Sequence, residues 1–320
     1  MKYVSKGLPA RSLFTLLCVL SLSCLRAQTD LDAIMMAKKN LCIGGMYSHS
    51  EWQDYWEGNL KRNNQNLGTV STKMFAAMGN YGITSKLNVL FSAPYVRTNA
   101  SAGTMRGMSG VQDLSLWLKW KAVTTPLGKG RLALFAIGGA SIPLSNYVAD
   151  YLPLAIGLRS KSASARIMAD YESGKFFVTA SGTYTLRSNV NIDRTSYYTT
   201  GSHLTNEVEI PNVASVNFRT GLRSKYLIAE AIVANMTTLG GFDMRRNDMP
   251  FPSNKMVATT AGINVKYTVK QVRGLEIIAG GNRVLSGRNV GKSTTVNAGF
   301  FYIFDFARNT KKIITNTKGN

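Results

Sequence analysis

The sequence predicts an all-β chain that folds as a single transmembrane antiparallel β-barrel of about 12 strands (10–14), with long extracellular loops and short periplasmic turns. Three observations predict this fold. Apolar and polar residues alternate in one segment after another, the connections between these segments are alternately long and short, and charged residues occur on the polar faces. A watery lumen permits such charges, whereas the dry interior of a soluble β-sandwich does not.

The alternation is clear in the stretch "VQDLSLWLKWKA", in which Leu114, Leu116, Leu118 and Trp120 share one face of a strand. Asp113, Lys119 and Lys121 fall on the opposite face. A helix is excluded because a period of 3.6 residues would scatter each set around its cylinder. The closing run has the same pattern, with the aromatic residues Phe300, Tyr302, Phe304 and Phe306 on one face.

Repeating this reading along the chain gives the expected strands, most of which reach the roughly ten residues that cross a bilayer at a tilt. They cover residues 41–50, 68–81, 87–97, 110–123, 131–142, 163–171, 176–186, 213–222, 226–236, 257–268, 275–283 and 294–306. A soluble sandwich or a lipocalin-like barrel, with the apolar face pointing inward, is the alternative. Such a fold has no reason to place every long loop at one end.

The ends of the chain predict export. Residues 1–27 combine a basic start, an apolar stretch and small residues before a cleavage site after Ala27, as a secretory signal peptide does. Its removal takes four basic residues from a chain of formal charge +21, which leaves about +17. Lipidation at Cys24 is an alternative. We expect a short N-terminal arm or helix at 28–40, the barrel at 41–306, and a polar basic C-terminal tail at 307–320. The expected location is the outer membrane of a Gram-negative bacterium.

Residues for chemistry are scarce. Without the signal peptide, Cys42 is alone and makes neither an intramolecular disulfide nor a structural zinc site. The stretch "SHSEWQD" places Ser48, His49, Ser50 and Glu51 near the end of the first strand, which raises a barrel-embedded lipid hydrolase or a metal site as alternatives. A polar extracellular rim explains the stretch better. The sequence therefore predicts no catalytic residues, no metal and no cofactor.

The segment "GRNVGKSTT", residues 287–295, is similar to a phosphate-binding loop. Its first glycine, Gly287, is one residue too late for the spacing G-x-x-x-x-G-K-[ST]. The segment also leads into an alternating strand and not into a helix. We therefore expect no nucleotide here, and we interpret the segment as the last extracellular loop of the barrel.

Two motifs resemble a known family. The segment "GNYGITSKLNVLFSAPYV" (79–96) carries a Y-G-[IL]-T turn before a strand ending in P-Y, and "SGVQDLSLWLKWK" (109–121) is similar to a G-x-x-D-L-x-L-x-x-K-[WY] strand. Both patterns are typical of the outer-membrane barrels grouped with the meta-pathway of phenol degradation. The likeness covers 68–142 best and extends to exported barrels of Bacteroidetes-type bacteria. It implies a passive transporter for hydrophobic or aromatic compounds. The closing aromatic, Phe306, resembles the signal by which the barrel-assembly machinery recognises its substrates.

Candidate site residues follow from this reading. Charged residues on the polar faces are expected to line the lumen: Asp113, Lys119, Lys121, Arg166, Asp170, Arg219, Glu230 and Lys266. The long loop 239–254 carries prolines, aromatics and paired arginines, so Phe242, Arg245, Arg246 and Phe251 are expected at the mouth of the barrel.

The basic excess admits several partners. Lipopolysaccharide phosphates are expected beside Arg245, Arg246, Arg288 and Lys292, and lumen cations favour anionic solutes. A solvated surface explains part of the excess, and no motif supports nucleic acid. The functional expectation is a passive channel for small hydrophobic or aromatic molecules. A structural or adhesive barrel with a closed lumen is the alternative.

Overall fold

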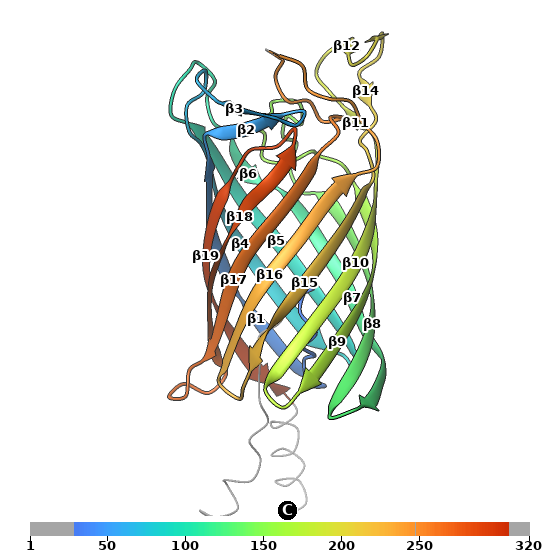
Figure 1. The fold of residues 1–320 in the computed structure, drawn as a ribbon, viewed down its shortest axis with the longest axis vertical. Helices are drawn as coiled ribbons and strands as arrows, with labels where there is room; N and C mark the ends of the chain where they lie inside the picture. Colours follow the sequence, from blue (N-terminus) through green and yellow to red (C-terminus); the bar gives the residue numbers. More distant parts are fainter. Residues whose placement is uncertain (1–28, 247, 307–320) are drawn as a thin grey trace, which may run out of the picture.

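The computed structural model describes residues 29–246 and 248–306, and these form a closed antiparallel β-barrel (Figure 1). Twelve long strands make its wall, with each strand paired to its neighbours and with β1 joining β19 to β4. They are β1 (Asn40–Trp52), β4 (Val70–Gly82), β5 (Leu87–Ala100), β7 (Asp113–Leu127), β8 (Gly130–Pro143), β9 (Ser162–Ser173), β10 (Phe176–Arg187), β15 (Val213–Arg223), β16 (Leu227–Thr238), β17 (Val257–Thr268), β18 (Leu275–Arg288) and β19 (Thr294–Asp305). The fold class predicted from the sequence is confirmed.

The two ends of the barrel differ in their connections. At one end the strands are joined by short turns, and the tightest are those at Gly128–Lys129 and Gly174–Lys175. Gly128 has φ 57° and Gly174 has φ 61°, the left-handed backbone that two-residue hairpins favour and that glycine adopts without strain. This end is the periplasmic one by the usual polarity of outer-membrane barrels.

The opposite, extracellular end carries the long connections and their small strands (Figure 1). The pair β2 (Asp54–Glu57) and β3 (Leu60–Asn63) forms a hairpin, and β6 (Ser109–Val111) adds to the edge of β5. The long loop after β10 contains β11 (Val190–Asn191), β12 (Tyr197–Tyr198), β13 (Ser202–His203) and β14 (Glu207–Val208).

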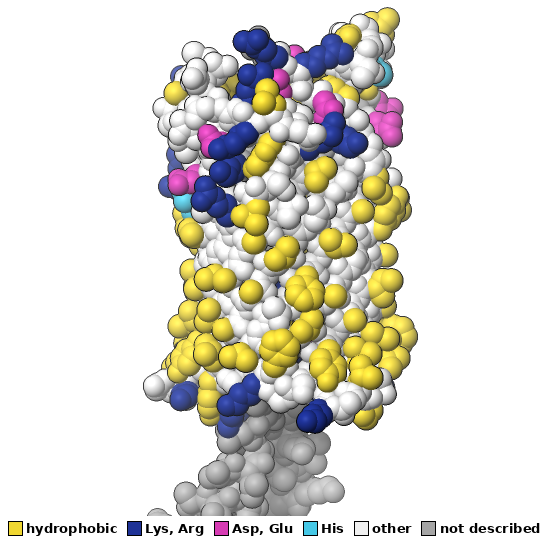
Figure 2. Space-filling view, in the orientation of Figure 1, with side chains coloured by type: hydrophobic (Ala, Val, Ile, Leu, Met, Phe, Trp, Pro, Cys, Tyr) yellow, Lys and Arg dark blue, Asp and Glu magenta, His cyan; other side chains and the backbone are white. Residues whose placement is uncertain are grey.

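The wall separates apolar from polar side chains as its alternation requires. Outward residues such as Ile167, Ile263 and Phe300 are 75%, 66% and 62% exposed, whereas inward Lys119 is fully buried. Figure 2 shows the consequence on one face of the barrel: apolar side chains cover the lower and middle wall, and charged side chains gather above and below them. An aqueous solvent would oppose so much exposed apolar surface, and a bilayer favours it.

The observed strands differ from the predicted ones mainly at their ends. Several run two to five residues further, as β18 does to Arg288, and β7 begins at Asp113 because β6 takes the residues before it. The closing strand ends at Asp305, one residue before the predicted end. Among residues 29–306, leaving out 247, no helix is long and apolar enough to cross a membrane. The predicted signal peptide and the predicted C-terminal tail lie outside the described residues.

Candidate functional site in the lumen

The lumen is occupied by the segment that precedes the first strand. Residues 29–39 run inside the wall without helical structure. Asp32 folds the segment on itself, because its carboxylate accepts hydrogen bonds from the backbone N–H groups of Thr29 (2.7 Å) and Ile34 (3.0 Å). This local turn exposes the carbonyl oxygens of the segment toward the wall.

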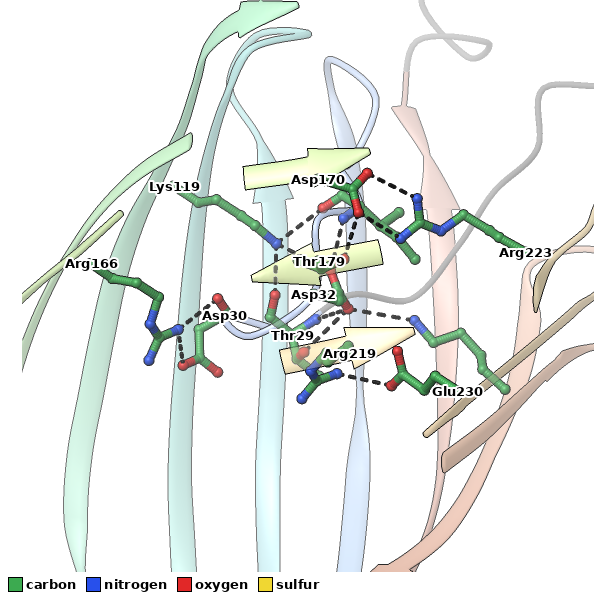
Figure 3. A network of polar contacts seen from close by, with 12 residues as sticks. Thr29, Asp30, Asp32, Lys119, Arg166, Asp170, Thr179, Arg219, Arg223 and Glu230 are labelled. Carbon is green, nitrogen blue, oxygen red and sulfur yellow. Dashed lines mark hydrogen bonds and ion pairs between the residues drawn. The ribbon is translucent and has the colours of Figure 1, made fainter. Parts of the chain in front are cut away.

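Lys119 of β7 binds this turn (Figure 3). Its ammonium group donates to the carbonyl oxygens of Thr29 (2.8 Å) and Ile34 (3.1 Å) and to the carboxylate of Asp32 (3.2 Å). An ammonium group has three donors, and here each has an acceptor. The side chain is fully buried, so these contacts replace the water that the charge gives up.

Two further cations hold the segment from other strands. Arg166 of β9 donates to the carbonyl oxygen of Asp30 (2.7 Å) and to its carboxylate (2.9 Å). Lys266 of β17 lies 3.7 Å from the carboxylate of Asp32. Since β7, β9 and β17 stand at different positions around the barrel, the segment is tied across the lumen and not to one side of it.

Apolar side chains of the segment pack against inward residues on two parts of the wall. Met36 is 1% exposed and joins a cluster with Cys42, Ile278, Phe301 and Ile303. Ala33 and Met35 pack against a second cluster. It comprises Ala133, Phe135, Ile137 and Met168. Fully burying a side chain such as Met36 stabilises the docked segment by about 1.5–3 kcal/mol.

Two small cavities lie beside the segment in the described part of the lumen, and both border Ile34. One has a volume of about 360 Å³ and is lined by Met46, Met78 and Ile278 together with polar and charged side chains. The other, of about 330 Å³, lies against Lys121 and the carboxylates of Asp170 and Glu172. Neither approaches the bore of a wide aqueous pore.

Other inward charges form ion pairs with one another. Arg223 donates to Asp170 (3.1 Å) and Glu172 (3.3 Å), and its guanidinium lies 4.1 Å from the ring centre of Phe177. Arg219 donates to Glu230 (2.9 Å). Pairing keeps these buried charges compatible with an enclosed lumen.

The structure places the eight lumen candidates on the inward face of the wall, in different roles. Lys119, Arg166 and Lys266 hold the N-terminal segment, and three others belong to the pairs just described. Lys121 lines the smaller cavity, and Asp113 accepts a hydrogen bond from the hydroxyl of Tyr147 (2.6 Å) near the extracellular end.

The mouth candidates lie in the extracellular loops. Phe251 stacks on Tyr197 with ring centres 5.4 Å apart, and Phe242 lies 6.4 Å from Phe251. The Arg245 guanidinium lies 5.1 Å from the centre of the Tyr198 ring. Arg246 borders a cavity of about 270 Å³ that also involves Trp52, Tyr55 and Glu57.

The segment "GRNVGKSTT" connects β18 to β19 at the extracellular end, and Asn289 within it joins three loops. Its side-chain oxygen accepts from the N–H groups of Gly58 (2.7 Å) and Met244 (3.2 Å). Its amide nitrogen donates to Asp243 (2.9 Å) and to the carbonyl oxygen of Lys255 (2.7 Å). Arg288 forms an ion pair with Asp243 beside it. The segment that resembles a phosphate-binding loop in sequence therefore holds neighbouring loops together, through the side-chain amide of Asn289.

The alternation of β1 separates the residues of a hypothetical hydrolase. His49 faces outward, where its Nε2 lies 3.6 Å from Glu51, and Ser48 and Ser50 face inward. A nucleophile and a base from this stretch therefore stand on opposite sides of the wall. Within the described residues, no group of three His, Cys, Asp or Glu side chains is placed to hold a metal ion.

A hollow of about 940 Å³ lies on the outer wall over β7 to β10, β15 and β16. Glycines and alanines create it, since Gly138 and Gly182 have open space where a Cβ atom would stand. Trp120, Ile167 and Tyr184 border it on the lipid side. It belongs to the membrane-facing surface and not to the lumen.

Comparison with known proteins places the fold among outer-membrane barrels. No family model matches the sequence, and no curated protein matches it. The structure is similar to the COG4313 outer membrane channel from Pseudomonas putida F1, with a TM-score of 0.67 and 14% identity over 87% of this chain and 100% of that one. The translocator domain of the autotransporter NalP from Neisseria meningitidis aligns at a TM-score of 0.44 with 11% identity, over 92% of this chain and 96% of that one. The likeness to the Pseudomonas putida channel shows that the chain has the fold of an outer-membrane β-barrel.

Sequence reasoning missed the N-terminal segment as a functional element. Asp30 and Asp32 are two of only 17 acidic residues in a chain with 38 basic ones, and they stand next to a wall with inward lysines and arginines. This charge complementarity is the sequence signal from which the segment could have been found.

Proposed function

We propose that this chain is a passive outer-membrane channel for small, hydrophobic or aromatic molecules, whose lumen is controlled by residues 29–39. The observation that carries the proposal is the set of contacts from Lys119, Arg166 and Lys266 to Asp30 and Asp32. A barrel whose lumen is filled by its own wall side chains needs no separate segment held by buried charges. In a channel, such a segment provides a removable closure of the lumen.

The substrate class is supported by the lumen itself and by the motif resemblance at 79–96 and 109–121. The larger cavity offers the methionines Met46 and Met78 beside Ile228 and Ile278, surfaces that adapt to apolar guests. Its volume of about 360 Å³ is at the small end of ligand sites, which suits a single aromatic ring and not an oligosaccharide.

The wider setting is part of the same proposal. The chain is exported to the outer membrane of a Gram-negative, Bacteroidetes-type bacterium through a cleaved signal peptide, and it belongs with the phenol-degradation type of barrels. Its closing strand is received by the barrel-assembly machinery, and Phe306, which stacks on Phe304, is the residue recognised. Outer-membrane lipids and lipopolysaccharide surround it. It acts without an enzyme activity or a cofactor.

A closed structural or adhesive barrel is the second candidate, because the segment occupies the lumen and the two cavities beside it in the described structure are small. Liposome swelling separates the two. The full mature chain and a variant lacking residues 29–36 are reconstituted and exposed to a small aromatic alcohol, a small anion and a disaccharide. The channel predicts entry of the aromatic in the intact protein and faster entry of all three in the deletion. Impermeability of both proteins to every solute would support the closed barrel.

A further inference from the structure

A row of aromatic side chains marks the membrane boundary on the outer wall near the extracellular end. Tyr47 of β1 pairs with Phe75 of β4, and Phe75 pairs with Tyr95 of β5. The three side chains are 45%, 51% and 48% exposed. Aromatic girdles of this kind lie at the interface between the hydrocarbon and the headgroups.

One step further toward the outside, the same strands carry cations. Lys73 stands two residues before Phe75 on β4, Arg97 stands two residues after Tyr95 on β5, and the two are paired directly across the strands. A step of two residues advances about 6.5–7 Å along a strand, so both lie just beyond the aromatic row. Both side chains are exposed on the wall.

This placement is unfavourable for the protein alone. Like charges directly opposite one another destabilise a strand pair. In the described part of the chain, neither Lys73 nor Arg97 has a carboxylate within ion-pair distance. Glu51 on the neighbouring strand β1 lies beside His49, the residue that pairs with Lys73 across the strands. An anion outside the protein therefore relieves the repulsion.

A second group of cations lies at the same end, on the neighbouring part of the wall. Arg283 is exposed on β18, and Lys61 and Lys292 lie in the adjoining loops around Asp54. Lys61 is 2.8 Å from the Asp54 carboxylate, and contact with the Lys61 ammonium lowers the pKa of Lys292. One carboxylate thus serves several cations. Figure 2 shows Lys and Arg side chains gathered above the apolar band on this side.

We propose that Lys73 and Arg97, with Arg283, Lys61 and Lys292 beside them, bind the phosphate groups of the outer-leaflet glycolipid, lipopolysaccharide. Its acyl chains then lie along the aromatic row of Tyr47, Phe75 and Tyr95. Arginine and lysine form short, charge-assisted hydrogen bonds to phosphate oxygens, and the guanidinium fork of Arg97 suits two of them.

The glycolipid is favoured over other phosphates by position. The cations stand directly above an apolar surface at the end of the barrel that faces outward, where that lipid forms the leaflet. Of the residues expected from sequence alone, Lys292 belongs to the proposed site. Arg288 and Arg245 are less suited to it, since Arg288 is paired with Asp243 and Arg245 lies over Tyr198. The site depends on the outer-membrane location proposed above, but not on transport through the lumen.

The test compares two double variants of the full mature chain in detergent. Lys73→Gln/Arg97→Gln removes the paired cations, and Lys129→Gln/Lys175→Gln removes two exposed lysines from the periplasmic turns. Binding of bis-phosphorylated lipid A is measured by native mass spectrometry. We expect at least about tenfold weaker binding for the first variant and unchanged binding for the second. Heat-modifiable migration on a gel checks that both barrels are folded.

Several results would overturn the site. They are equal affinity of the first variant and the parent, equal binding of dephosphorylated lipid A, or equal competition by phosphatidylglycerol vesicles or inorganic phosphate. If the double variant does not fold, Arg97→Lys provides the same test, because it keeps the charge but loses the fork and is expected to weaken binding by a smaller factor. Liposome swelling by the first variant should equal that of the parent, so failure here is distinct from failure of the channel.

Discussion

The buried ammonium group of Lys119 lies 3.2 Å from the carboxylate of Asp32, a residue 87 positions earlier in the chain. The pair joins the middle of a wall strand to a segment that precedes the barrel. Lys119 contributes two more hydrogen bonds to carbonyl oxygens of the same segment, so one side chain sets much of its position. The docking of the segment in the lumen therefore depends on a few buried charges.

Replacing Lys119 with methionine is expected to release the segment. Removing one partner of a buried ion pair costs about 3–5 kcal/mol, because the other charge is left in a poor environment. The docked segment can escape that cost by leaving the lumen. Single-channel conductance in a planar bilayer should rise several-fold. Lys121→Met is the matched control, an inward lysine on the same strand without a bond to the segment in the described structure. Equal conductance of both variants would contradict the role of Lys119.

Cys42 offers a direct reporter of the same event. Its side chain is 1% exposed beneath Met36, in the cluster that anchors the segment. A thiol reagent should therefore label the parent protein slowly. The Asp30→Asn/Asp32→Asn variant, which loses its ion pairs to Arg166, Lys119 and Lys266, should be labelled at least about tenfold faster. Asp248→Asn in an extracellular loop provides the control. If the Asp30→Asn/Asp32→Asn variant is labelled at the same rate as the parent and the control, the segment stays docked without these charges.

The wall was predictable from the sequence because side chains in every strand must alternate between the lipid and the lumen. Runs such as Leu114 to Trp120 place an apolar, lipid-facing side chain at every second position. The strand β17 was predicted with its observed bounds, Val257–Thr268. The beginning of β10 at Phe176 and that of β19 at Thr294 were also predicted. Strand ends were less regular, because pairing extends past the membrane where no pattern marks it.

The occupied lumen was not predictable in the same way. Residues 29–39 carry no period, and their position follows from charges that lie far apart in the sequence. Lys119 is 87 residues from Asp32, and Arg166 is 136 residues from Asp30. The role of Asn289 was hidden for a similar reason. Its neighbours Gly58, Met244 and Lys255 come from loops whose approach only the closed barrel creates.

Asn289 should hold the extracellular loops together. It is 4% exposed, has φ 52°, and makes the four hydrogen bonds described above. Asn289→Ala removes those bonds and places a Cβ-bearing residue without a capping side chain in the left-handed region, whereas Asn289→Gly removes the bonds alone. Leaving buried groups unsatisfied costs about 1–3 kcal/mol each. A protease should cut the loops 53–69 and 239–256 faster in both variants than in the parent. The increase in rate should be larger for Asn289→Ala than for Asn289→Gly. Parent-like resistance of both would refute this role.

The ion pair of Asp243 and Arg288 gives these loops a defined response to acid. Hydrogen bonding to Arg288 is the main cause that lowers the pKa of Asp243, from its usual 3.8 to about 2. A lowered pKa means that the pair favours loop closure at pH values above about 3.8, and that this contribution is lost as the pH falls through about 2. Hydrogen-exchange protection factors of residues 239–256 should therefore stay constant from pH 7 to pH 4 and fall only below that range. Asp243→Asn should lower them already at pH 7, and Asp248→Asn in the same loop should not. Protection that declines between pH 7 and pH 5 in the parent would assign the closure to another group.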